Sequence, residues 1–277
     1  MRRRIKWFIG VLIAVLVGAL FFHDQNNRIV VTEHEIDLDI QHGQELAVVH
    51  LSDLHSKGFG TQQQKLLTKV SAEKPDLIFM TGDLIDAKKA DSKEPLELMR
   101  GLVQLAPVYF VTGNHEWWSG EYGQLEQALD QLGVVVLRNE SMNVTVHERE
   151  FTLIGIDDPA MLNQEEEQTV VEFMQQAMDG NNAETDFTLL LAHRPDFFYL
   201  YQEFDIDLVL SGHAHGGQIG LPYNGGLVAP NQGFFPKYVK GAYEEDETIM
   251  IVHRGLGNSI IPQRLFNQPE VIRISIK

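Results

Sequence analysis

The fold is indicated by one short stretch, an apolar run that ends in polar residues: Leu46-Ala47-Val48-Val49-His50-Leu51-Ser52-Asp53-Leu54-His55. The run contains β-branched valines and predicts a strand that is buried on both faces. Asp53 and His55 occupy alternate positions after it, so in an extended segment both side chains can face the same way. The stretch therefore predicts a buried strand that brings a carboxylate and an imidazole to one point.

Four later segments repeat the pattern of an apolar run followed at once by polar residues. The runs are Leu77–Met80, Val108–Thr112, Thr188–Ala192 and Leu208–Leu210. The polar residues at their ends include, in chain order, Asp83, Asn114, His115, His193, His213 and His215. Because the carboxyl ends of parallel strands meet at one edge of a sheet, where ligands bind in open α/β folds, we expect the five polar clusters to converge.

The segments between and after these runs complete the predicted architecture. Apolar spacings near three and four predict helices over Gln62–Ala72, Pro95–Leu105 and Glu121–Leu132, and their alternation with strands indicates an α/β sheet. The remaining strand predictions are an edge strand at Ile29–Ile40, a buried strand at Val134–Leu137, a hairpin at Val144–Ile156 and further strands within Thr248–Ile276. The hairpin and the strands within Thr248–Ile276 indicate a second sheet packed on the first.

The segment Gly216–Gly241 is rich in glycine, proline and aromatic residues, and loops of this kind commonly carry specificity. Its adjacent Phe234 and Phe235 allow two interpretations: they pack over the site, or they enter a lipid interface. We favour packing over the site.

Composition limits the kind of protein and the kind of site. With 277 residues, 44% hydrophobic and 22% charged, the chain is expected to form one globular domain with an appendage. It contains no cysteine, so any metal must be held by His, Asp, Glu or Asn. The formal charge of −17 makes a broad nucleic-acid-binding face unlikely on electrostatic grounds.

The N-terminus predicts a membrane anchor. Arg2, Arg3, Arg4 and Lys6 precede an uncharged apolar run, Trp7–Phe22, which as a helix would reach roughly 24 Å across a hydrocarbon core of ~30 Å. We favour an uncleaved signal anchor over residues 1–28, ahead of a domain over residues 29–277. The basic flank predicts a cytoplasmic N-terminus and a body outside the cytoplasm, that is, a single-pass cell-membrane protein. A cleaved signal peptide, a weak twin-arginine signal and a buried soluble helix are the alternatives.

Metal binding explains why so many ionisable groups should gather at one buried edge. Carboxylates and imidazoles are costly to bury together unless a cation compensates them. A mixture of His and Asp suits Mn, Fe or Zn, whereas an all-oxygen site would suit Ca or Mg. Gly82, Gly113 and Gly212 each precede a candidate ligand and could allow a tight turn and a close backbone approach.

Together these motifs resemble those of the calcineurin-like metallophosphoesterases. The pattern D-x-H, G-D-x-x-D, G-N-H-[DE], a lone H and G-H-x-H is matched in order by Asp53–His55, Gly82–Asp86, Gly113–Glu116, His193 and Gly212–His215. Within this family the sequence most resembles the bacterial, membrane-associated YkuE/YaeI-like branch, because Leu210–Gln218 and Arg254–Ser259 are also similar to the corresponding segments of that branch. The resemblance extends from about Asp53 to the C-terminus.

The resemblance implies a fold and a site. The fold is a four-layer α/β/β/α sandwich of two mixed sheets flanked by helices. One divalent metal ion (Mn, Fe or Zn) would be bound by Asp53, His55 and His215, and a second by Asn114, His193 and His213, with Asp83 bridging both. His115 would approach the phosphate, to stabilise charge or to protonate the leaving group. The reaction would be hydrolysis of a phosphate mono- or diester, or a pyrophosphate, by attack of a metal-bridging hydroxide.

Several roles stay open. Asp86 either supports a ligand or caps a helix, and Glu116 is expected to be structural or to support a ligand, without a direct part in catalysis. Arg194, Arg254 and Asn258 hold substrate phosphate or have structural roles. Membrane attachment motivates a lipid phosphoester as substrate. The alternatives from other classes are a membrane-tethered metal-binding scaffold without turnover, and a peptidase or amidase with a related site.

Overall fold

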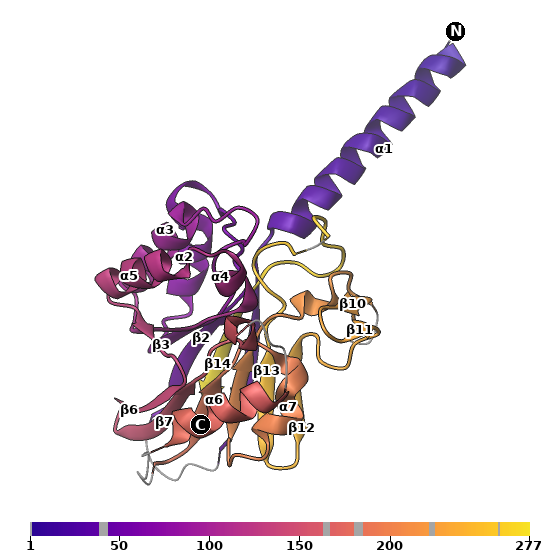
Figure 1. Ribbon diagram of the computed structural model, residues 1–277. Coiled ribbons are helices and arrows are strands. Elements are labelled where there is room, and N and C mark those ends of the chain that lie inside the picture. The colour runs from indigo at the N-terminus through magenta and orange to yellow at the C-terminus, as the bar shows by residue number, and fades with distance from the viewer. Residues whose placement is uncertain (1, 39–43, 163–166, 180–184, 222–224, 260) are drawn as a thin grey trace.

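The body is built around two six-stranded sheets, from which one long helix projects (Figure 1). The computed structural model describes residues 2–38, 44–162, 167–179, 185–221, 225–259 and 261–277. The predicted edge strand at Ile29–Ile40 is present as β1 (Val30–Ile36), and the last two residues predicted for it lie outside the described residues.

The first sheet contains both parallel and antiparallel neighbours. Its strand order is β1, β14 (Glu270–Ile276), β2 (Leu46–Leu51), β3 (Leu77–Thr81), β4 (Val108–Val111) and β5 (Val135–Val136). β2 to β5 are parallel, whereas β14 is antiparallel to β2. The C-terminal strand β14 was expected to belong to a second sheet and instead lies between β1 and β2. In this position both edges of β14 are hydrogen-bonded to a neighbouring strand.

The second sheet is also mixed. Its strand order is β12 (Gly241–Glu245), β13 (Thr248–Val252), β9 (Leu208–Ser211), β8 (Thr188–Leu191), β7 (Arg149–Gly155) and β6 (Glu140–Val146). The predicted hairpin is confirmed as β6–β7, and β7, β8, β9 and β13 run parallel. Strands β8 and β9, which carry two of the polar clusters, thus belong to a different sheet from β2, β3 and β4.

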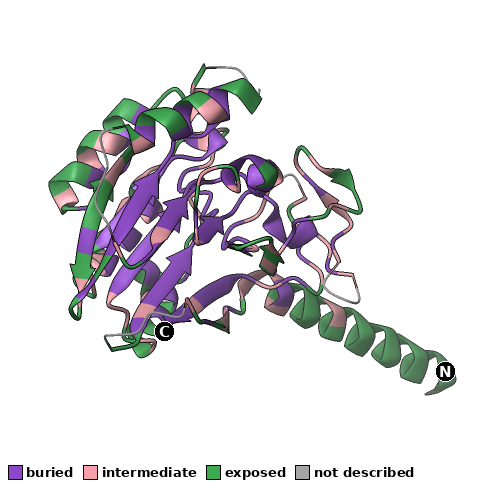
Figure 2. Cartoon of the chain, turned by 90° about the horizontal axis from the view of Figure 1, so that it is seen from below, coloured by how far each residue is buried: buried purple, intermediate pink, exposed green. Residues whose placement is uncertain are grey.

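Three apolar cores separate four layers, as expected. The helices α2 (Gln64–Ala72), α3 (Lys93–Leu102) and α5 (Tyr122–Leu132) pack on the outer face of the first sheet. The two sheets pack against each other through a second core that includes Val48, Phe79 and Ile274. On the outer face of the second sheet lie α6 (Glu167–Met178) and α7 (Phe198–Tyr201). Figure 2 shows the buried strands between the partly exposed helices.

The helical predictions for the first sheet were close to the structure, and those for the second were incomplete. α2, α3 and α5 lie within or near their predicted ranges, and α5 ends at Gly133, whose φ of 83° suits the left-handed C-terminal position of a helix. α6 was not predicted, although its buried Val170, Phe173, Met174 and Ala177 follow helical spacing.

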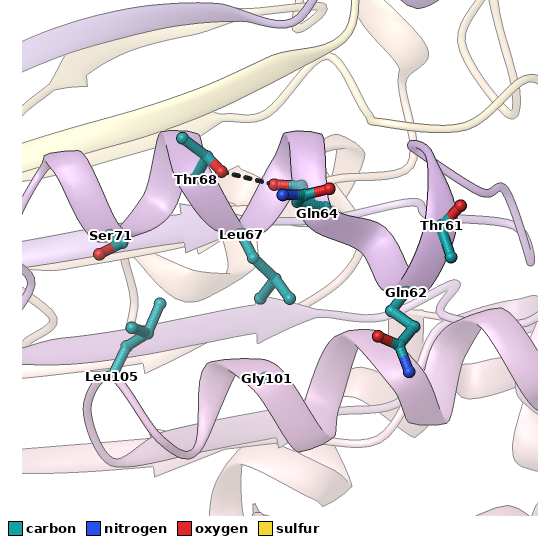
Figure 3. Close-up of a pocket in the computed structure, with 8 residues that line it drawn as sticks. All are labelled: Thr61, Gln62, Gln64, Leu67, Thr68, Ser71, Gly101 and Leu105. Atoms are coloured by element: carbon teal, nitrogen blue, oxygen red, sulfur yellow. Dashed lines mark hydrogen bonds between the residues drawn. The ribbon is translucent and has the colours of Figure 1, made fainter.

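A groove between α2 and α3 is lined by polar side chains together with Leu67 and Leu105 (Figure 3). Its volume is about 600 Å³, and its lining includes Thr61, Thr68 and Gly101. It lies in the helical layer that covers the outer face of the first sheet and contains none of the candidate ligands.

The N-terminal helix α1 (Arg2–Asn27) stands away from the body and exposes its apolar side chains, among them Trp7, Leu12 and Leu16. At 26 residues it is roughly 39 Å long, enough to cross a hydrocarbon core of about 30 Å. Its length and composition are those of a membrane-spanning helix. The alternative of a helix buried in a soluble core is wrong, because none of its apolar window is buried.

Candidate metal centre

The ends of five strands bring the candidate ligands together between the two sheets. β2, β3 and β4 of the first sheet lead into Asp53 and His55, into Asp83, and into Asn114 and His115, respectively. β8 and β9 of the second sheet lead into His193, His213 and His215. Six of the seven predicted ligands fall into two groups of close donor atoms, and Asp83 is common to both.

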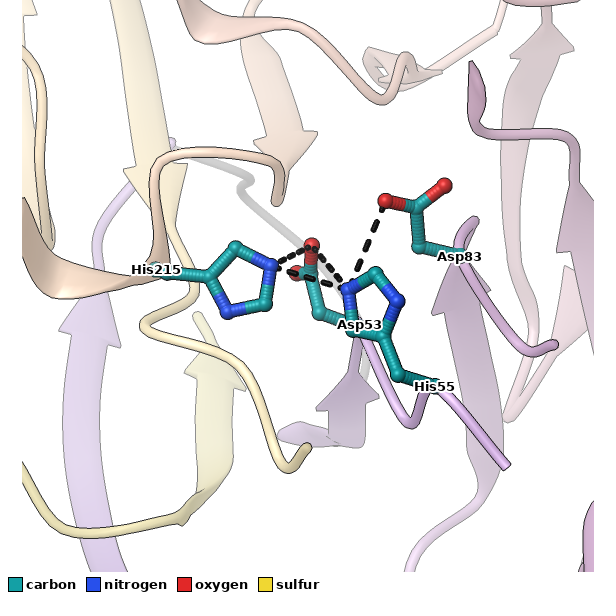
Figure 4. Close-up of side chains that lie close together, drawn as sticks. All are labelled: Asp53, His55, Asp83 and His215. Carbon is teal, nitrogen blue, oxygen red and sulfur yellow. Dashed lines mark hydrogen bonds and ion pairs between the residues drawn. The ribbon is translucent and has the colours of Figure 1, made fainter. Parts of the chain in front are cut away.

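The first group consists of Asp53, His55, Asp83 and His215, whose side chains point toward one another in Figure 4. His55 Nε2 lies 2.9 Å from His215 Nε2 and 3.5 Å from Asp83 Oδ2. His215 Nε2 lies 3.2 Å from Asp53 Oδ1. All four residues are buried, so the group is a compact set of two carboxylates and two imidazoles shielded from solvent.

The second group consists of Asp83, His193 and His213. His193 Nε2 lies 3.3 Å from Asp83 Oδ2 and 3.2 Å from His213 Nδ1. The other ring nitrogen of His193, Nδ1, is 2.6 Å from the carbonyl oxygen of Thr81 and must donate to it. That hydrogen bond leaves Nε2 as the ring nitrogen directed toward Asp83 and His213, the one that could bind a metal after losing its proton.

Asn114 and His115 begin the short helix α4 (Asn114–Trp118), which follows β4. The Oδ1 atom of Asn114 is buried and lacks a hydrogen-bond partner among the described residues, as expected for an oxygen placed to bind a cation. His115 is half-buried, its backbone N–H donates to Asp83 Oδ1 at 2.9 Å, and its Nδ1 accepts from the N–H of Ala87 at 3.0 Å.

Glu116 has the structural role that was predicted for it. Its carboxylate accepts the backbone N–H groups of Asp83 at 2.8 Å, Gly113 at 2.7 Å and Ile85 at 3.1 Å. It thereby ties the turn after β3 to the turn after β4. Asp86 does not cap a helix: its Oδ1 accepts from the N–H of Lys88 at 2.7 Å within a turn, and the next helix begins only at Lys93. Its carboxylate lies near His55 and His115, which supports the alternative that it assists a ligand.

The pKa shifts show how strongly the buried charges interact. Burial lowers the pKa of His55 to about 3, so this ring is neutral near neutral pH. Burial would also lower the pKa of His193, but the adjacent Asp83 carboxylate raises it to about 10. Burial would raise the pKa of Asp83, yet His193 holds it well below its usual range. Two buried carboxylates thus draw positive charge into the site, which a divalent cation would supply.

Backbone conformation is unusual at the same positions. Asp53, His55, Asp83, His213 and His215 have φ between 47° and 63°, in the left-handed region that residues other than glycine seldom adopt. Such strain is typical of functional sites, where the surrounding structure fixes the side chains.

All three glycines that precede candidate ligands are required by close approach, and a Cβ atom at Gly113 would lie 2.3 Å from Asp83 Oδ1. Gly82 has φ of 86°, and a Cβ atom there would lie 2.5 Å from the backbone nitrogen of Gly113. A Cβ atom at Gly212 would lie 1.9 Å from Ser52 Oγ and 2.5 Å from Asp53 Oδ2. The expectation of a close backbone approach is therefore confirmed at all three, and a left-handed turn conformation is present at Gly82.

The arginines considered as phosphate ligands are engaged elsewhere. Arg194 is buried and donates to both carboxylate oxygens of Asp158, at 2.7 and 3.0 Å. Arg254 forms an ion pair with the buried Glu270 at 2.6 Å. Asn258 donates to the carbonyl oxygen of Pro262 at 2.8 Å. These contacts support the structural interpretation of all three residues.

Three residues that contact His213 or His215 were not predicted from the sequence. Asn267 Nδ2 donates to the carbonyl oxygen of His215 at 2.7 Å, and Arg264 Nη2 lies 3.5 Å from His215 Nδ1. Asn231 Oδ1 lies 3.2 Å from His213 Nε2. Asn231 falls in the loop Gly216–Gly241, where a functional residue was expected but not identified. Arg264 and Asn267 had no local sequence signal.

Comparisons with known proteins agree with this geometry. A family model described as calcineurin-like phosphoesterase matches residues 46–217. YkuE of Bacillus subtilis (strain 168), an uncharacterized metallophosphoesterase, is 30% identical over 260 residues, which cover 91% of this chain and 86% of YkuE. A transmembrane protein with metallophosphoesterase domain from Danio rerio is 31% identical, over 84% of this chain and 53% of its own length.

The solved structure of NAD nucleotidase (NadN) from Haemophilus influenzae is similar in fold. The TM-score is 0.52 at 17% sequence identity, over 78% of this chain and 46% of that one. At this identity the similarity concerns the arrangement of sheets and helices alone.

Proposed function

Because the chain belongs to the calcineurin-like phosphoesterase family, we propose that it is a hydrolase of phosphate mono- or diesters, pyrophosphates included, that works with two divalent cations. The observation that carries this proposal is the position of Asp83. Its carboxylate is shared by two groups of donor atoms, each of which combines residues that follow strands of both sheets. A shared carboxylate between two such groups is the arrangement that a two-metal hydrolase needs.

The two groups suggest which residues hold each cation. In this proposal the first cation is bound by Asp53, His55, Asp83 and His215. The second is bound by Asp83, Asn114, His193 and His213, and the unpartnered Oδ1 of Asn114 supports its inclusion. Imidazole nitrogens mixed with carboxylate oxygens favour Mn, Fe or Zn over Ca.

The chemistry divides between the cations and the residues around them. When bound, the cations would neutralise phosphoryl oxygens and supply a hydroxide nucleophile near neutral pH. The side chain of Asp83 fixes the spacing between the two groups, and Thr81 fixes the ring of His193 through its carbonyl oxygen. His115, half-buried at the edge of the first group, would contact the substrate phosphate.

The helix α1 suggests where this reaction takes place. We propose that residues 1–28 anchor the protein in the cell membrane by a single span and that residues 29–277 form the phosphoesterase domain. The basic residues at the start of α1 favour a cytoplasmic N-terminus, which would put the domain on the extracytoplasmic side. The net charge of −21 on residues 29–277 argues against a nucleic acid as the substrate.

Hydrolysis can be tested with the full chain in detergent micelles, because residues of α1 pack on the body. We expect release of p-nitrophenol from an aryl phosphate mono- or diester after addition of Mn²⁺, and loss of that activity on chelation. Measuring bound metal in parallel should give two ions per chain. Absence of any metal-dependent release, with metal bound, would instead favour a scaffold without turnover.

The substrate class is a separate expectation. Since the domain would lie at a membrane, we expect phospholipids or isoprenyl phosphates in mixed micelles to be hydrolysed with a higher kcat/KM than matched water-soluble phosphoesters. The measurement is phosphate or headgroup release at equal bulk concentration. Good turnover of soluble phosphoesters together with none of the lipids would contradict the lipid hypothesis and leave the phosphoesterase proposal intact.

A further inference from the structure

The helix α1 is held to the body by specific contacts of its last turn. Gln25 is buried, and its Oε1 accepts the backbone N–H of Phe266 at 2.6 Å. Asn26 Oδ1 accepts the N–H of Arg264 at 2.7 Å, and its Nδ2 donates to the carbonyl oxygen of Pro262 at 3.0 Å. From the other side, Lys57 Nζ donates to the carbonyl oxygen of Asn26. α1 is therefore not a loose tether: its direction sets the orientation of the body.

Exposed aromatic side chains continue the apolar surface of α1 onto the body. Phe266 is 69% exposed, and its ring centroid lies 6.0 Å from that of Phe21 in α1. Its backbone is in the left-handed region, with φ of 52°. A bulky residue seldom adopts this conformation, so the body fixes Phe266 in an outward position rather than leaving it to collapse.

A second outward-facing aromatic pair lies on β11 (Gly233–Phe234) and the residue after it. Phe234 and Phe235 are each 74% exposed, so the prediction that they pack over the site is wrong. Their loop is braced: Phe235 N–H donates to the carbonyl oxygen of Leu227, and the side chain of Gln232 bonds both backbone groups of Tyr238. Exposed rings on a braced loop form a fixed apolar projection.

The two aromatic elements lie on the same side of the body. Figure 1 shows β10 (Val228–Ala229) and β11 on the side of the body from which α1 departs. Phe266 lies at the base of α1 itself. We use the name aromatic rim for Phe234, Phe235 and Phe266. Exposed apolar groups gathered beside a membrane-spanning helix are typical of an interfacial contact.

Basic side chains also lie at the base of α1. Residues after 28 carry a net charge of −21, which opposes approach to an anionic bilayer. A pocket of about 530 Å³ at the base of α1 is nevertheless lined by Arg28, Lys65 and Lys69, with Ile29 as its apolar wall. Its position directly after the last residue of the helix is where lipid headgroups would lie.

We propose that the body rests on the bilayer: the aromatic rim enters the interface, and the basic pocket faces lipid phosphates. This inference rests on the membrane-anchor part of the proposed function. It also has a consequence for the site, because Arg264 and Asn267, which contact His215, flank Phe266 in sequence. One loop would then both touch the membrane and support a candidate ligand, so the site would open at a fixed position beside the headgroups.

The chain contains no cysteine, so single cysteines can be introduced into the full-length protein and labelled with a fluorophore. In vesicles of zwitterionic and anionic phospholipid that carry a chain-linked quencher, labels in Phe234→Cys, Phe235→Cys and Phe266→Cys are expected to be quenched at least about twofold more than a label in Met142→Cys. Met142 is an exposed apolar residue of β6, and Figure 1 shows β6 at the far end of the body from α1. Quenching of a label in Leu16→Cys, within α1, reports whether α1 is inserted in the bilayer.

A second series puts the label next to the phenylalanine rings instead of in their place. A label in Lys237→Cys should be quenched when Phe234 and Phe235 are present and should lose at least about half of that quenching in the Phe234→Asp, Phe235→Asp background. Equal quenching in both backgrounds, or quenching at the rim no stronger than at position 142, overturns the docking proposal. If position 16 is quenched in that case, the anchor stands; if it is not, both fail. Hydrolysis of an aryl phosphate by the same samples tests the catalytic proposal independently.

Discussion

Replacing Asp83 by asparagine is expected to reduce kcat/KM for aryl phosphates by at least about 10³-fold. Asp83 Oδ2 lies 3.5 Å from His55 Nε2 and 3.3 Å from His193 Nε2, and it is the one carboxylate common to both groups of candidate ligands. The amide of asparagine has nearly the same shape but carries no charge. Its substitution should therefore weaken binding at both groups at once, and bound metal should fall below two ions per chain.

Asp130→Asn is the matched control, since Asp130 is an exposed residue of α5 and the chemical change is identical. Its activity and metal content should equal those of the unchanged protein. Thermal unfolding of both variants, measured with chelator present, separates loss of the site from loss of the fold. A folded Asp83→Asn protein that keeps activity within about tenfold of the original would show that Asp83 does not bridge two catalytic cations.

Much of the fold could be predicted because its signals are local. Buried strands such as β2 and β3 are continuous apolar runs, and α5 ends at a glycine suited to its C-terminus. Sheet membership could not be predicted in this way. β14 pairs with β1 and β2, which lie more than 200 residues earlier, and its sequence does not distinguish one sheet from the other. Pairing between distant strands depends on the whole chain.

The candidate site, like the fold, could be predicted only where its sequence signals are local. Motif spacing grouped residues such as Asp53 and His215, and the structure places them within 3.2 Å of each other. What the sequence could not show is how the rings are held. The candidate ligands of the first group have left-handed backbone conformations, which no local pattern predicts. Arg264, which contacts His215, lies 49 residues later in the chain. Phe234 and Phe235 were misjudged because exposure depends on the surrounding fold and not on the residues themselves.

His115 offers a way to distinguish the two roles considered for it. Its Nδ1 accepts the N–H of Ala87 at 3.0 Å, so the ring proton lies on Nε2. A neutral ring in this tautomer donates a hydrogen bond well, but becoming a strong acid would require a proton on Nδ1, where the Ala87 N–H already points. The geometry thus favours stabilisation of charge on the phosphoryl oxygens over proton transfer to the leaving group.

His115→Asn is accordingly expected to lower kcat/KM by about 10²-fold, close to the effect of removing one donor from a charged transition state. The asparagine oxygen can still accept from Ala87, but no atom replaces Nε2. His115→Gln extends an amide N–H toward that position and should recover about tenfold of the loss. If charge stabilisation is the role, both variants should be impaired similarly with p-nitrophenyl and alkyl phosphates. A loss confined to the alkyl esters, whose poor leaving groups need a proton, would contradict it and assign His115 as the acid.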